Sequence, residues 1–326
     1  TSTGPDARGA HAMVYDSARN RVVLFGGLGP DGKIFGDTWE WDGSTWTKKA
    51  STGPAARFHH ALAFDSARNR VVLFGGWNGS IFLRDTWEWN GTAWVLRANN
   101  IGPQARDMHA MAFDVDGGET VLFGGWNGNT LKHDTWTWDG NIWTQRSNSG
   151  PEAREGHAMA YDSDRDVVVL FGGENGAYFQ DTWEWNGSSW SLRSLIGPSP
   201  RFGHALAFDE TLQQVVLFGG FDGQAKSDSW EWNGTAWFQK FSGPPSSREN
   251  FAMAYDGARE VTVLFGGYDG ERQGDTWTWN GQVWNRVATD GPEPREGAAM
   301  VYDSFREVIV LFGGTGNSSL LADTWE

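Results

Sequence analysis

Seven arginines recur along the chain at steps of 47 to 49 residues, and their side chains could together bind an anion. A guanidinium holds a carboxylate through two parallel hydrogen bonds, so a ring of arginines would suit a carboxylate-bearing ligand. Seven aspartates recur at similar steps and could neutralise the arginines instead. We favour this second interpretation, because a residue repeated in every unit first serves the unit. The arginines are Arg8, Arg57, Arg106, Arg154, Arg201, Arg248 and Arg295, and the aspartates are Asp37, Asp85, Asp134, Asp181, Asp228, Asp275 and Asp323.

The residue directly after each arginine varies from unit to unit. These residues are Gly9, Phe58, Asp107, Glu155, Phe202, Glu249 and Glu296. A variable position in a constant frame is where ligand specificity can reside. We therefore expect Asp107 and Glu155 to be polar ligand contacts, together with Arg57, Arg106 and Arg154. Acid–base catalysis needs sheltered carboxylates, but the sequence pairs none of these with a nucleophile or a base, so no catalytic residue is predicted.

A histidine stands three residues after the arginine in five of the units, at His11, His60, His109, His157 and His204. Phe251 and Ala298 hold the same place in the other two units. A position that accepts Phe or Ala is more typical of half-buried packing than of metal ligation, and five histidines spread around a ring lie too far apart to share one ion. Cysteine is absent, which excludes thiolate ligands. No metal or cofactor is predicted.

Tryptophan is abundant, with 21 residues, and all but two belong to a recurring phrase such as DTWEWNGTAW at residues 85–94. The exceptions, Trp77 and Trp126, each follow FGG and open a WNG loop, and Phe221 and Tyr268 hold the same position in later units. We expect these four rings to form the aromatic part of a ligand-binding patch, since exposed aromatic rings suit sugar rings and peptide side chains. The alternative is that each ring folds over its own loop and only packs.

The chain consists of seven similar units, since LFGG recurs at the same steps as the arginines. Unit two illustrates the strands that we expect, which are HALAFD from residue 60, RVVLFGG from residue 70, DTWEW from residue 85 and AWVLRA from residue 93. The second of these is apolar enough to be covered on both faces. An NG pair between the third and fourth is a strong hairpin signal. No segment shows a sustained helical period.

Four antiparallel strands repeated at this interval predict the blade of a β-propeller. One such sheet cannot bury both of its faces, whereas blades stacked around an axis cover one another. We predict an all-β, seven-bladed propeller of four-stranded antiparallel blades, in which the repeated tryptophans fill the space between blades. The single domain spans 1–326, in units of approximately 8–56, 57–105, 106–153, 154–200, 201–247, 248–294 and 295–326.

The double glycine after an apolar strand, the aromatic residue that follows and the Trp at fixed spacing resemble the kelch repeat over essentially the whole chain. The resemblance implies a central channel and one binding face, formed by the loops between strands two and three and between blades. It does not imply an activity, since kelch propellers include peptide-binding modules, sialic-acid isomerising proteins and a copper-radical oxidase. The oxidase cofactor needs a Cys crosslinked to Tyr, so that chemistry is poorly supported here.

The seventh unit departs from the pattern, because it stops at Glu326 inside its third strand. The opening residues, TSTGP, do not supply a fourth strand either. We expect that the sequence is a fragment of a longer chain with additional domains, or that its seventh blade is incomplete with three strands. An eighth blade beyond residue 326 is a further alternative.

Charge and hydropathy narrow the range of partners. The chain has 26 Lys and Arg against 41 Asp and Glu, a net charge of −15, whereas nucleic-acid binding normally needs a basic face. No run of about 18 apolar residues is present, so no membrane span is predicted. No signal peptide is visible, but a mature secreted chain would look the same. The location stays open, with a secreted or extracellular one slightly favoured.

These features together predict a non-enzymatic binding propeller that holds a protein, peptide or glycan at its loop face and channel mouth. One alternative is a small-molecule enzyme, such as a sugar isomerase or lyase, acting at the same mouth. Another is a structural module of a larger multidomain protein. A deep pocket with paired, pKa-shifted groups would indicate the enzyme, whereas a broad aromatic face would indicate the binding module.

Overall fold

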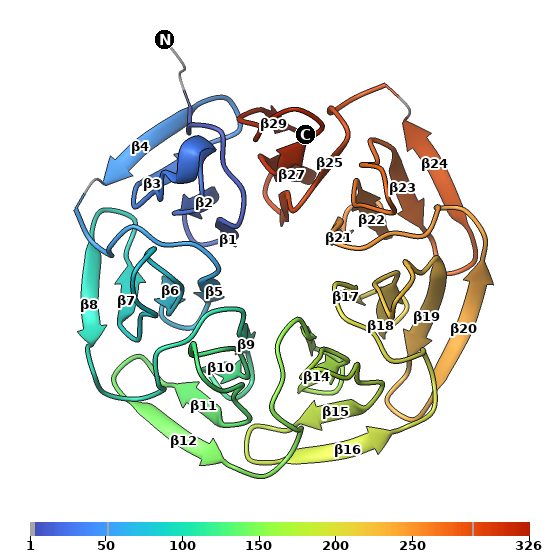
Figure 1. Cartoon of the computed structure of the whole chain (residues 1–326), viewed down its shortest axis with the longest axis horizontal. Coiled ribbons are helices and arrows are strands. Elements are labelled where there is room, and N and C mark those ends of the chain that lie inside the picture. The colour runs from blue at the N-terminus through green and yellow to red at the C-terminus, as the bar shows by residue number, and fades with distance from the viewer. Residues whose placement is uncertain (1–3, 51, 289) are drawn as a thin grey trace.

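The chain forms a ring of small sheets around a central channel (Figure 1). The structure is a computed structural model, and it describes residues 4–50, 52–288 and 290–326. Within this part there are six four-stranded antiparallel sheets, one three-stranded sheet, one two-stranded sheet beside it, and a single 3-10 turn at Pro30–Gly32. The predicted all-β, seven-bladed propeller is therefore confirmed.

Six of the blades in the described part have four strands that pair in chain order, and the first strand lies nearest the channel (Figure 1). Blades one to three contain β1 (Ala12–Asp16), β2 (Arg21–Phe25), β3 (Thr38–Trp41), β4 (Trp46–Ala50), β5 (Ala61–Asp65), β6 (Arg70–Phe74), β7 (Thr86–Trp89), β8 (Trp94–Ala98), β9 (Ala110–Asp114), β10 (Glu119–Phe123), β11 (Thr135–Trp138) and β12 (Trp143–Ser147). Blades four to six contain β13 (Ala158–Asp162), β14 (Val167–Phe171), β15 (Thr182–Trp185), β16 (Trp190–Ser194), β17 (Ala205–Asp209), β18 (Gln214–Phe218), β19 (Asp228–Trp232), β20 (Trp237–Ser242), β21 (Ala252–Asp256), β22 (Val261–Phe265), β23 (Thr276–Trp279) and β24 (Trp284–Ala288).

Blade seven is smaller than the others. It contains β26 (Ala299–Asp303), β27 (Val308–Phe312) and β29 (Thr324–Trp325), and the short strands β25 (Arg295–Glu296) and β28 (Thr315–Gly316) pair beside it. No fourth strand pairs with β29 among the described residues. The incomplete seventh blade that the sequence predicts is therefore confirmed.

The second strand of each blade forms the core, as its apolar sequence predicts. In β6, the side chains of Val71, Val72, Leu73 and Phe74 are all fully buried. A strand that is apolar at consecutive positions places hydrophobic side chains on both faces of its sheet. In a propeller both faces meet a neighbouring blade, so both are covered.

The repeated tryptophans join the blades, and blade two shows how. Trp87 bonds within its own blade, where its indole N–H donates to Asp85 at 2.6 Å. The other two indoles reach back to blade one, where Trp89 donates to Glu40 at 2.9 Å and Trp94 donates to Thr38 at 2.7 Å. Both of these rings are buried. The prediction that the repeated rings pack between blades is confirmed for these two positions of the phrase.

Trp185 of blade four is a variation on this pattern. Its ring is fully buried, as predicted, but its indole N–H has no hydrogen-bond partner among the described residues. The residue that faces it from blade three is Thr137, where blade one has Glu40. The threonine side chain is too short to replace the glutamate as acceptor.

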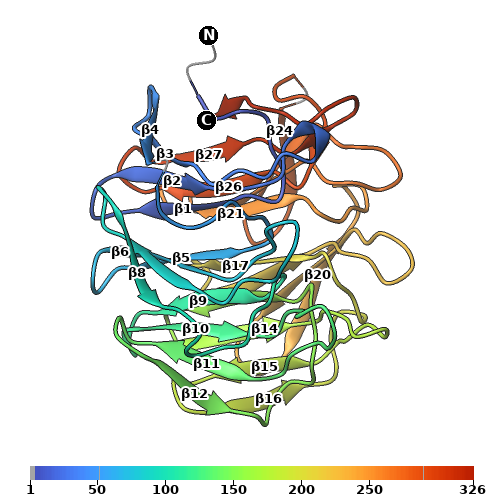
Figure 2. The same ribbon diagram turned by 60° about the vertical axis from the view of Figure 1, so that its left-hand side comes forward.

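In the described part of the chain, direct hydrogen bonds join blade seven to blade one. The N–H of Arg8 donates to the carbonyl of Leu321 at 3.1 Å, and the N–H of Gly314 donates to the carbonyl of Arg8 at 3.0 Å. The Trp46 indole also donates to Thr324 at 2.6 Å. Strands β1 and β26 therefore lie side by side, as Figure 2 shows. No helix in the described part is long and apolar enough to cross a membrane.

Candidate binding face at the channel mouth

The seven arginines are structural. The Arg154 guanidinium is fully buried and holds the Asp181 carboxylate through two bonds of 2.6 and 2.7 Å. It also donates to the carbonyls of Gly172 at 2.8 Å and Glu152 at 2.9 Å. The other six arginines make the same contacts with the aspartate of their own blade. The interpretation that aspartates neutralise the arginines is therefore confirmed.

Because their guanidinium groups are paired with aspartates, the arginines are not available to contact a ligand. Arg57, Arg106 and Arg154 were expected to contribute to the binding site, but their side chains are fully buried in the scaffold. The backbone of these residues has a second structural role. The carbonyl of Arg57, for example, accepts a hydrogen bond of 2.8 Å from Gly27 of the preceding blade. We leave the three arginines out of the proposal below.

The recurring histidines pack against the preceding blade. The His157 ring lies edge-on to Phe123, with centroids 5.5 Å apart, and Phe251 makes the same contact with Phe218. Burial, together with the charge of Arg154, lowers the pKa of His157 to about 3. A neutral ring that Phe can replace is a packing group, as the sequence suggests. No group of three or more His, Asp or Glu in the described residues could hold a metal ion.

Each blade presents three variable side chains on one constant backbone frame at the mouth of the channel. The residue after the arginine pairs with the residue after FGG, which in turn pairs with a residue of the loop between strands two and three. We call these sets the mouth triads. In blade order they are Gly9, Leu28 and Ile34; Phe58, Trp77 and Phe82; Asp107, Trp126 and Leu131; Glu155, Glu174 and Tyr178; Phe202, Phe221 and Ala225; Glu249, Tyr268 and Arg272; and Glu296, Thr315 and Leu320.

The triads of blades two and three carry the two tryptophans that the repeat leaves unexplained. Trp77 packs on Phe82, with ring centroids 4.4 Å apart, and both rings are partly exposed. Trp126 of the next blade is also partly exposed. Phe82 leans toward blade three, since a Cβ at Gly128 would lie 2.5 Å from its ring. The two tryptophans therefore belong to one sector of the mouth.

A second aromatic cluster joins blades four and five. Tyr178 stacks on Phe202, with centroids 5.7 Å apart and ring planes 19° apart. Phe221 lies edge-on to Phe202 at 5.8 Å and to Tyr178 at 6.4 Å. All three rings are partly exposed. The mouth triads of blades two to five thus form a continuous arc with an aromatic cluster at each end.

Carboxylates lie between the two aromatic clusters. Asp107 Oδ2 is 3.7 Å from His59 Nδ1, while Asp107 Oδ1 is buried without a partner among the described residues. Burial raises the pKa of Glu155, and the nearby charges of Asp107 and Glu174 raise it further. Like charges held this close repel one another, so a cation placed here would be attracted. The middle of the arc is therefore suited to a positively charged group.

Blade six differs from this arc. Arg272 of blade six holds Glu296 of blade seven at 2.7 Å and so neutralises that carboxylate. Burial raises the pKa of Glu249, and Glu296 contributes to the same shift. Tyr268 is 36% exposed, and no aromatic ring among the described residues packs on it as Phe82 packs on Trp77. We therefore place Tyr268 at the edge of the candidate face.

Comparison with protein families agrees with this architecture. The sequence matches the family model of the KLHDC2/KLHL20/DRC7 Kelch-repeats domain over residues 1–144, 52–195 and 117–280. The chain belongs to the Kelch-repeat family. No match was found among curated proteins. The Kelch fold suggests a protein-interaction module, as it is built from loops displayed on a rigid ring.

Sequence reasoning missed several residues of this Kelch face. Phe82, Glu174 and Tyr178 belong to the mouth triads but were not recognised. The loop after FGG differs in length between units, so the third triad position does not recur at a fixed spacing. Glu174 could have been found, because it holds the place of Trp77 and Trp126 in its own unit.

Proposed function

We propose that this Kelch propeller binds a peptide segment that carries basic and apolar side chains, and that it does so without catalysis. The observation that supports this most directly is the arc of mouth triads in blades two to five, with aromatic groups at both ends and carboxylates between them. The site consists of Trp77, Trp126, Asp107, Glu155 and Phe221, extended by Phe58, Phe82, Glu174, Tyr178 and Phe202.

The chemistry of the arc favours a peptide over a glycan. Asp107, Glu155 and Glu174 would attract a lysine or arginine side chain of the partner, because a cation relieves the repulsion between them. The Trp77 and Phe221 clusters would hold apolar side chains on either side of that cation. The net charge of −15 would further steer a basic partner toward the propeller. A neutral glycan would use the rings but not the carboxylates.

A peptide array tests the proposal. The strongest hits should contain Lys or Arg next to apolar residues, and the Trp77→Ala, Trp126→Ala double variant should bind them at least about tenfold more weakly. The Tyr268→Ala variant is the matched control, since it removes an aromatic ring of the same face outside the arc. Hits that are acidic, or that the double variant binds as well as the wild type, would contradict the proposal.

The carboxylates provide a second test with the same peptides. Glu155→Gln removes one negative charge with little change of shape, so affinity for a basic peptide should fall about threefold to tenfold. Because the pKa of Glu155 is raised, binding should also weaken as the pH falls toward that pKa, and the Glu155→Gln variant should show a smaller dependence. An identical pH profile for both proteins would exclude a role for this carboxylate.

A further inference from the structure

A set of backbone hydrogen bonds joins the blades between the mouth triads and the first strands, and it is formed by the residue two places after each recurring arginine. We call these residues the collar, and they are Ala10, His59, Met108, Gly156, Gly203, Asn250 and Gly297. All of them have positive φ, between 52° and 64°. At five seams the N–H of a collar residue donates to the carbonyl of the preceding one, as from His59 to Ala10 at 3.1 Å.

The collar is open at the seam between blades three and four. The N–H of Met108 donates to the carbonyl of His59 at 3.2 Å, and the carbonyl of Gly156 accepts from Gly203 at 3.4 Å. No hydrogen bond joins Met108 to Gly156, and no donor among the described residues reaches the Met108 carbonyl. Because the collar backbone repeats from blade to blade, this carbonyl points toward blade four as the His59 carbonyl points toward blade three. We call this opening the collar gap.

Two carboxylates flank the collar gap, because Asp107 precedes Met108 and Glu155 precedes Gly156. Asp107 is 7% exposed, and its Oδ1 atom has no partner in the part of the chain that the structure describes. Burial raises the pKa of Glu155, and the charge of Asp107 contributes to that rise. A buried carboxylate oxygen without a donor is unfavourable, and a cation stabilises it. The gap therefore combines three acceptors from two neighbouring blades.

A second opening in the collar, between blades seven and one, lacks this combination. Gly297 and Ala10 make no collar bond with each other within residues 4–50, 52–288 and 290–326. The residues that precede them are Glu296, which Arg272 holds at 2.7 Å, and Gly9, which has no side chain. A missing collar bond alone therefore does not create a cation site. Of the two openings, the collar gap has the unpaired carboxylate.

The arrangement of the acceptors selects among cations. A guanidinium is bound best by both oxygens of one carboxylate, as Arg154 is bound by Asp181. Asp107 does not offer such a pair, because its Oδ2 already lies 3.7 Å from His59 Nδ1 and Oδ1 alone is without a partner. An ammonium is a compact charge with three donors, so it can reach acceptors that belong to separate residues.

We propose that the collar gap binds the ammonium group of a lysine side chain of the partner, which donates to Asp107 Oδ1, the Met108 carbonyl and the Glu155 carboxylate. A lysine suits the burial of Asp107, because its charge is carried on a long, thin stem. The Met108 side chain is 43% exposed beside the gap and would pack on that stem. The inference rests on the proposed function and sharpens it, since it predicts that lysine is preferred to arginine between the two aromatic clusters.

Four short peptides test the charge and shape of the bound group. Each has the sequence Leu-Phe-X-Phe-Leu with a fluorophore at its C-terminus, and three are acetylated at the N-terminus, with lysine, arginine or acetyl-lysine as X. In an anisotropy titration the lysine peptide should bind saturably and at least about fivefold more tightly than the arginine peptide. The neutral acetyl-lysine peptide should bind at least about tenfold more weakly than the lysine peptide. The fourth peptide has norleucine as X and a free amino terminus, and it should also bind weakly.

The outcomes separate this inference from the proposed function. If arginine is bound as tightly as lysine, the ammonium site is overturned, while the propeller still binds basic peptides. If the norleucine peptide binds as tightly as the lysine peptide, the gap takes the amino terminus of a peptide, and the assignment to lysine is overturned. If acetyl-lysine is bound as tightly as lysine, or no peptide binds saturably, both proposals are overturned.

Two protein variants locate the bound ammonium. Asp107→Asn keeps the shape of the side chain but removes its charge, so affinity for the lysine peptide should fall at least about tenfold and lysine should lose its advantage over arginine. Glu249→Gln is the matched control, because Glu249 has the place of Glu155 in its own blade but precedes a collar bond that is made, from Asn250 to Gly203 at 3.1 Å. This variant should bind the lysine peptide like the wild type. Equal losses in the two variants, both folded by thermal unfolding, would contradict the assignment to the collar gap.

A carbonyl resonance tests the contact in the unaltered protein. Met108 and His109 form the single Met-His pair of the sequence, so labelling with carbonyl-13C methionine and 15N histidine gives one carbonyl–amide signal, which reports the Met108 carbonyl. The lysine peptide should shift this resonance, whereas the acetyl-lysine peptide at the same concentration should not. A resonance that stays unchanged when the lysine peptide saturates the protein would exclude Met108 as an acceptor and overturn the proposal.

Discussion

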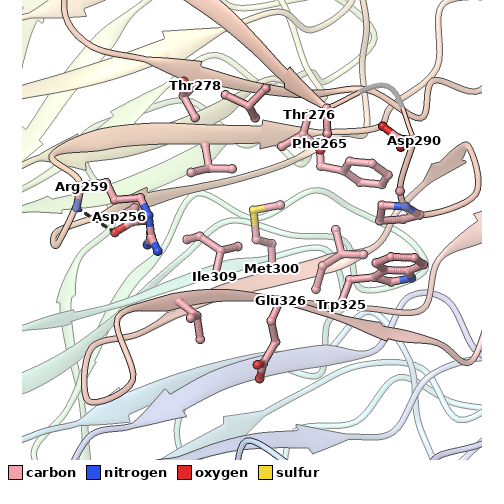
Figure 3. Close-up of a pocket in the computed structure, with 17 residues that line it drawn as sticks. Asp256, Arg259, Phe265, Thr276, Thr278, Asp290, Met300, Ile309, Trp325 and Glu326 are labelled. Carbon is pink, nitrogen blue, oxygen red and sulfur yellow. Dashed lines mark hydrogen bonds and ion pairs between the residues drawn. The ribbon is translucent and has the colours of Figure 1, made fainter.

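The seam between blades one and two includes the fourth strand β8 of blade two, whereas in the described part of the chain no fourth strand of blade seven lies at the seam between blades six and seven. The first contains Trp94, which touches Phe25 and Thr38 of the preceding blade. The second presents Phe265 and Thr276 to a groove (Figure 3). Both seams nevertheless keep their first strands side by side, since β21 lies against β26 as β1 lies against β5.

This difference distinguishes two sets of contacts between neighbouring blades, an inner layer and an outer layer. The inner layer consists of backbone hydrogen bonds around the channel, such as the bond from Gly267 to Arg295 at 2.8 Å, and it is present at every seam. The outer layer consists of the tryptophans that begin the fourth strands, and in the described part of the chain it is present at every seam except that between blades six and seven. The ring therefore closes through its inner layer, while the outer layer determines how tightly each pair of blades is held.

Making the closed seam resemble the open one should have the largest effect. Trp94→Ala removes a buried ring and its hydrogen bond, so the free energy of unfolding should fall by about 3–5 kcal/mol. Denaturant unfolding measures this loss. Trp325→Ala is the control in blade seven, where the ring is 39% exposed, and should cost less than about 1 kcal/mol. Similar losses in the two variants would contradict the distinction between the seams.

The buried histidines, which pack between neighbouring blades, can be tested through pH. The pKa of His157 is lowered from 6.5 to about 3 by burial, so the folded chain keeps this ring neutral while the unfolded chain takes up a proton below about pH 6.5. Stability should therefore be complete above pH 6.5 and should fall as the pH decreases from 6.5 toward 3. Each such histidine contributes a slope of about 1.4 kcal/mol per pH unit.

Replacing the histidine isolates its contribution to that slope. His157→Phe should reduce the loss of stability between pH 6 and pH 4, because Phe251 already makes the same ring contact in blade six. Unfolding curves at several pH values measure the slope. His133→Phe, at an exposed site outside the repeat, should leave it unchanged. If both variants keep the wild-type dependence of stability on pH, groups other than His157 cause that dependence.

Much of the fold follows from the sequence because each blade repeats the same local constraints. A residue such as Arg154 must pair with a carboxylate when it is buried, and Asp181 recurs at the distance needed to provide one. The position of His157 could be assigned to packing because Phe251 shares it. These inferences compare equivalent residues of different units, so they need no knowledge of the three-dimensional contacts.

The contacts between units were harder to predict. The sequence shows that Trp89 recurs, but not that its indole reaches Glu40 in the preceding blade. Phe82 and Tyr178 escaped notice because the loop lengths differ, although their backbones hold equivalent places in the mouth triads. The groove between blades six and seven was also missed, since only the folded ring brings Phe265 and Gly291 together.

The smallest effect concerns one missing acceptor within a closed seam. Among the described residues the Trp185 indole N–H has no partner, because Thr137 stands at the position where Glu88 accepts the Trp138 indole. Arg146 bonds to Thr137 as Arg97 bonds to Glu88. Thr137→Glu should supply both acceptors and raise the free energy of unfolding by about 1 kcal/mol. Thr137→Gln offers an uncharged acceptor and should gain less, since a charged acceptor makes the stronger bond with Arg146. Denaturant unfolding measures both variants. If neither is more stable than the wild type, the glutamate acceptors do not strengthen the seams that have them. The outer layer would then hold the blades together through ring packing alone.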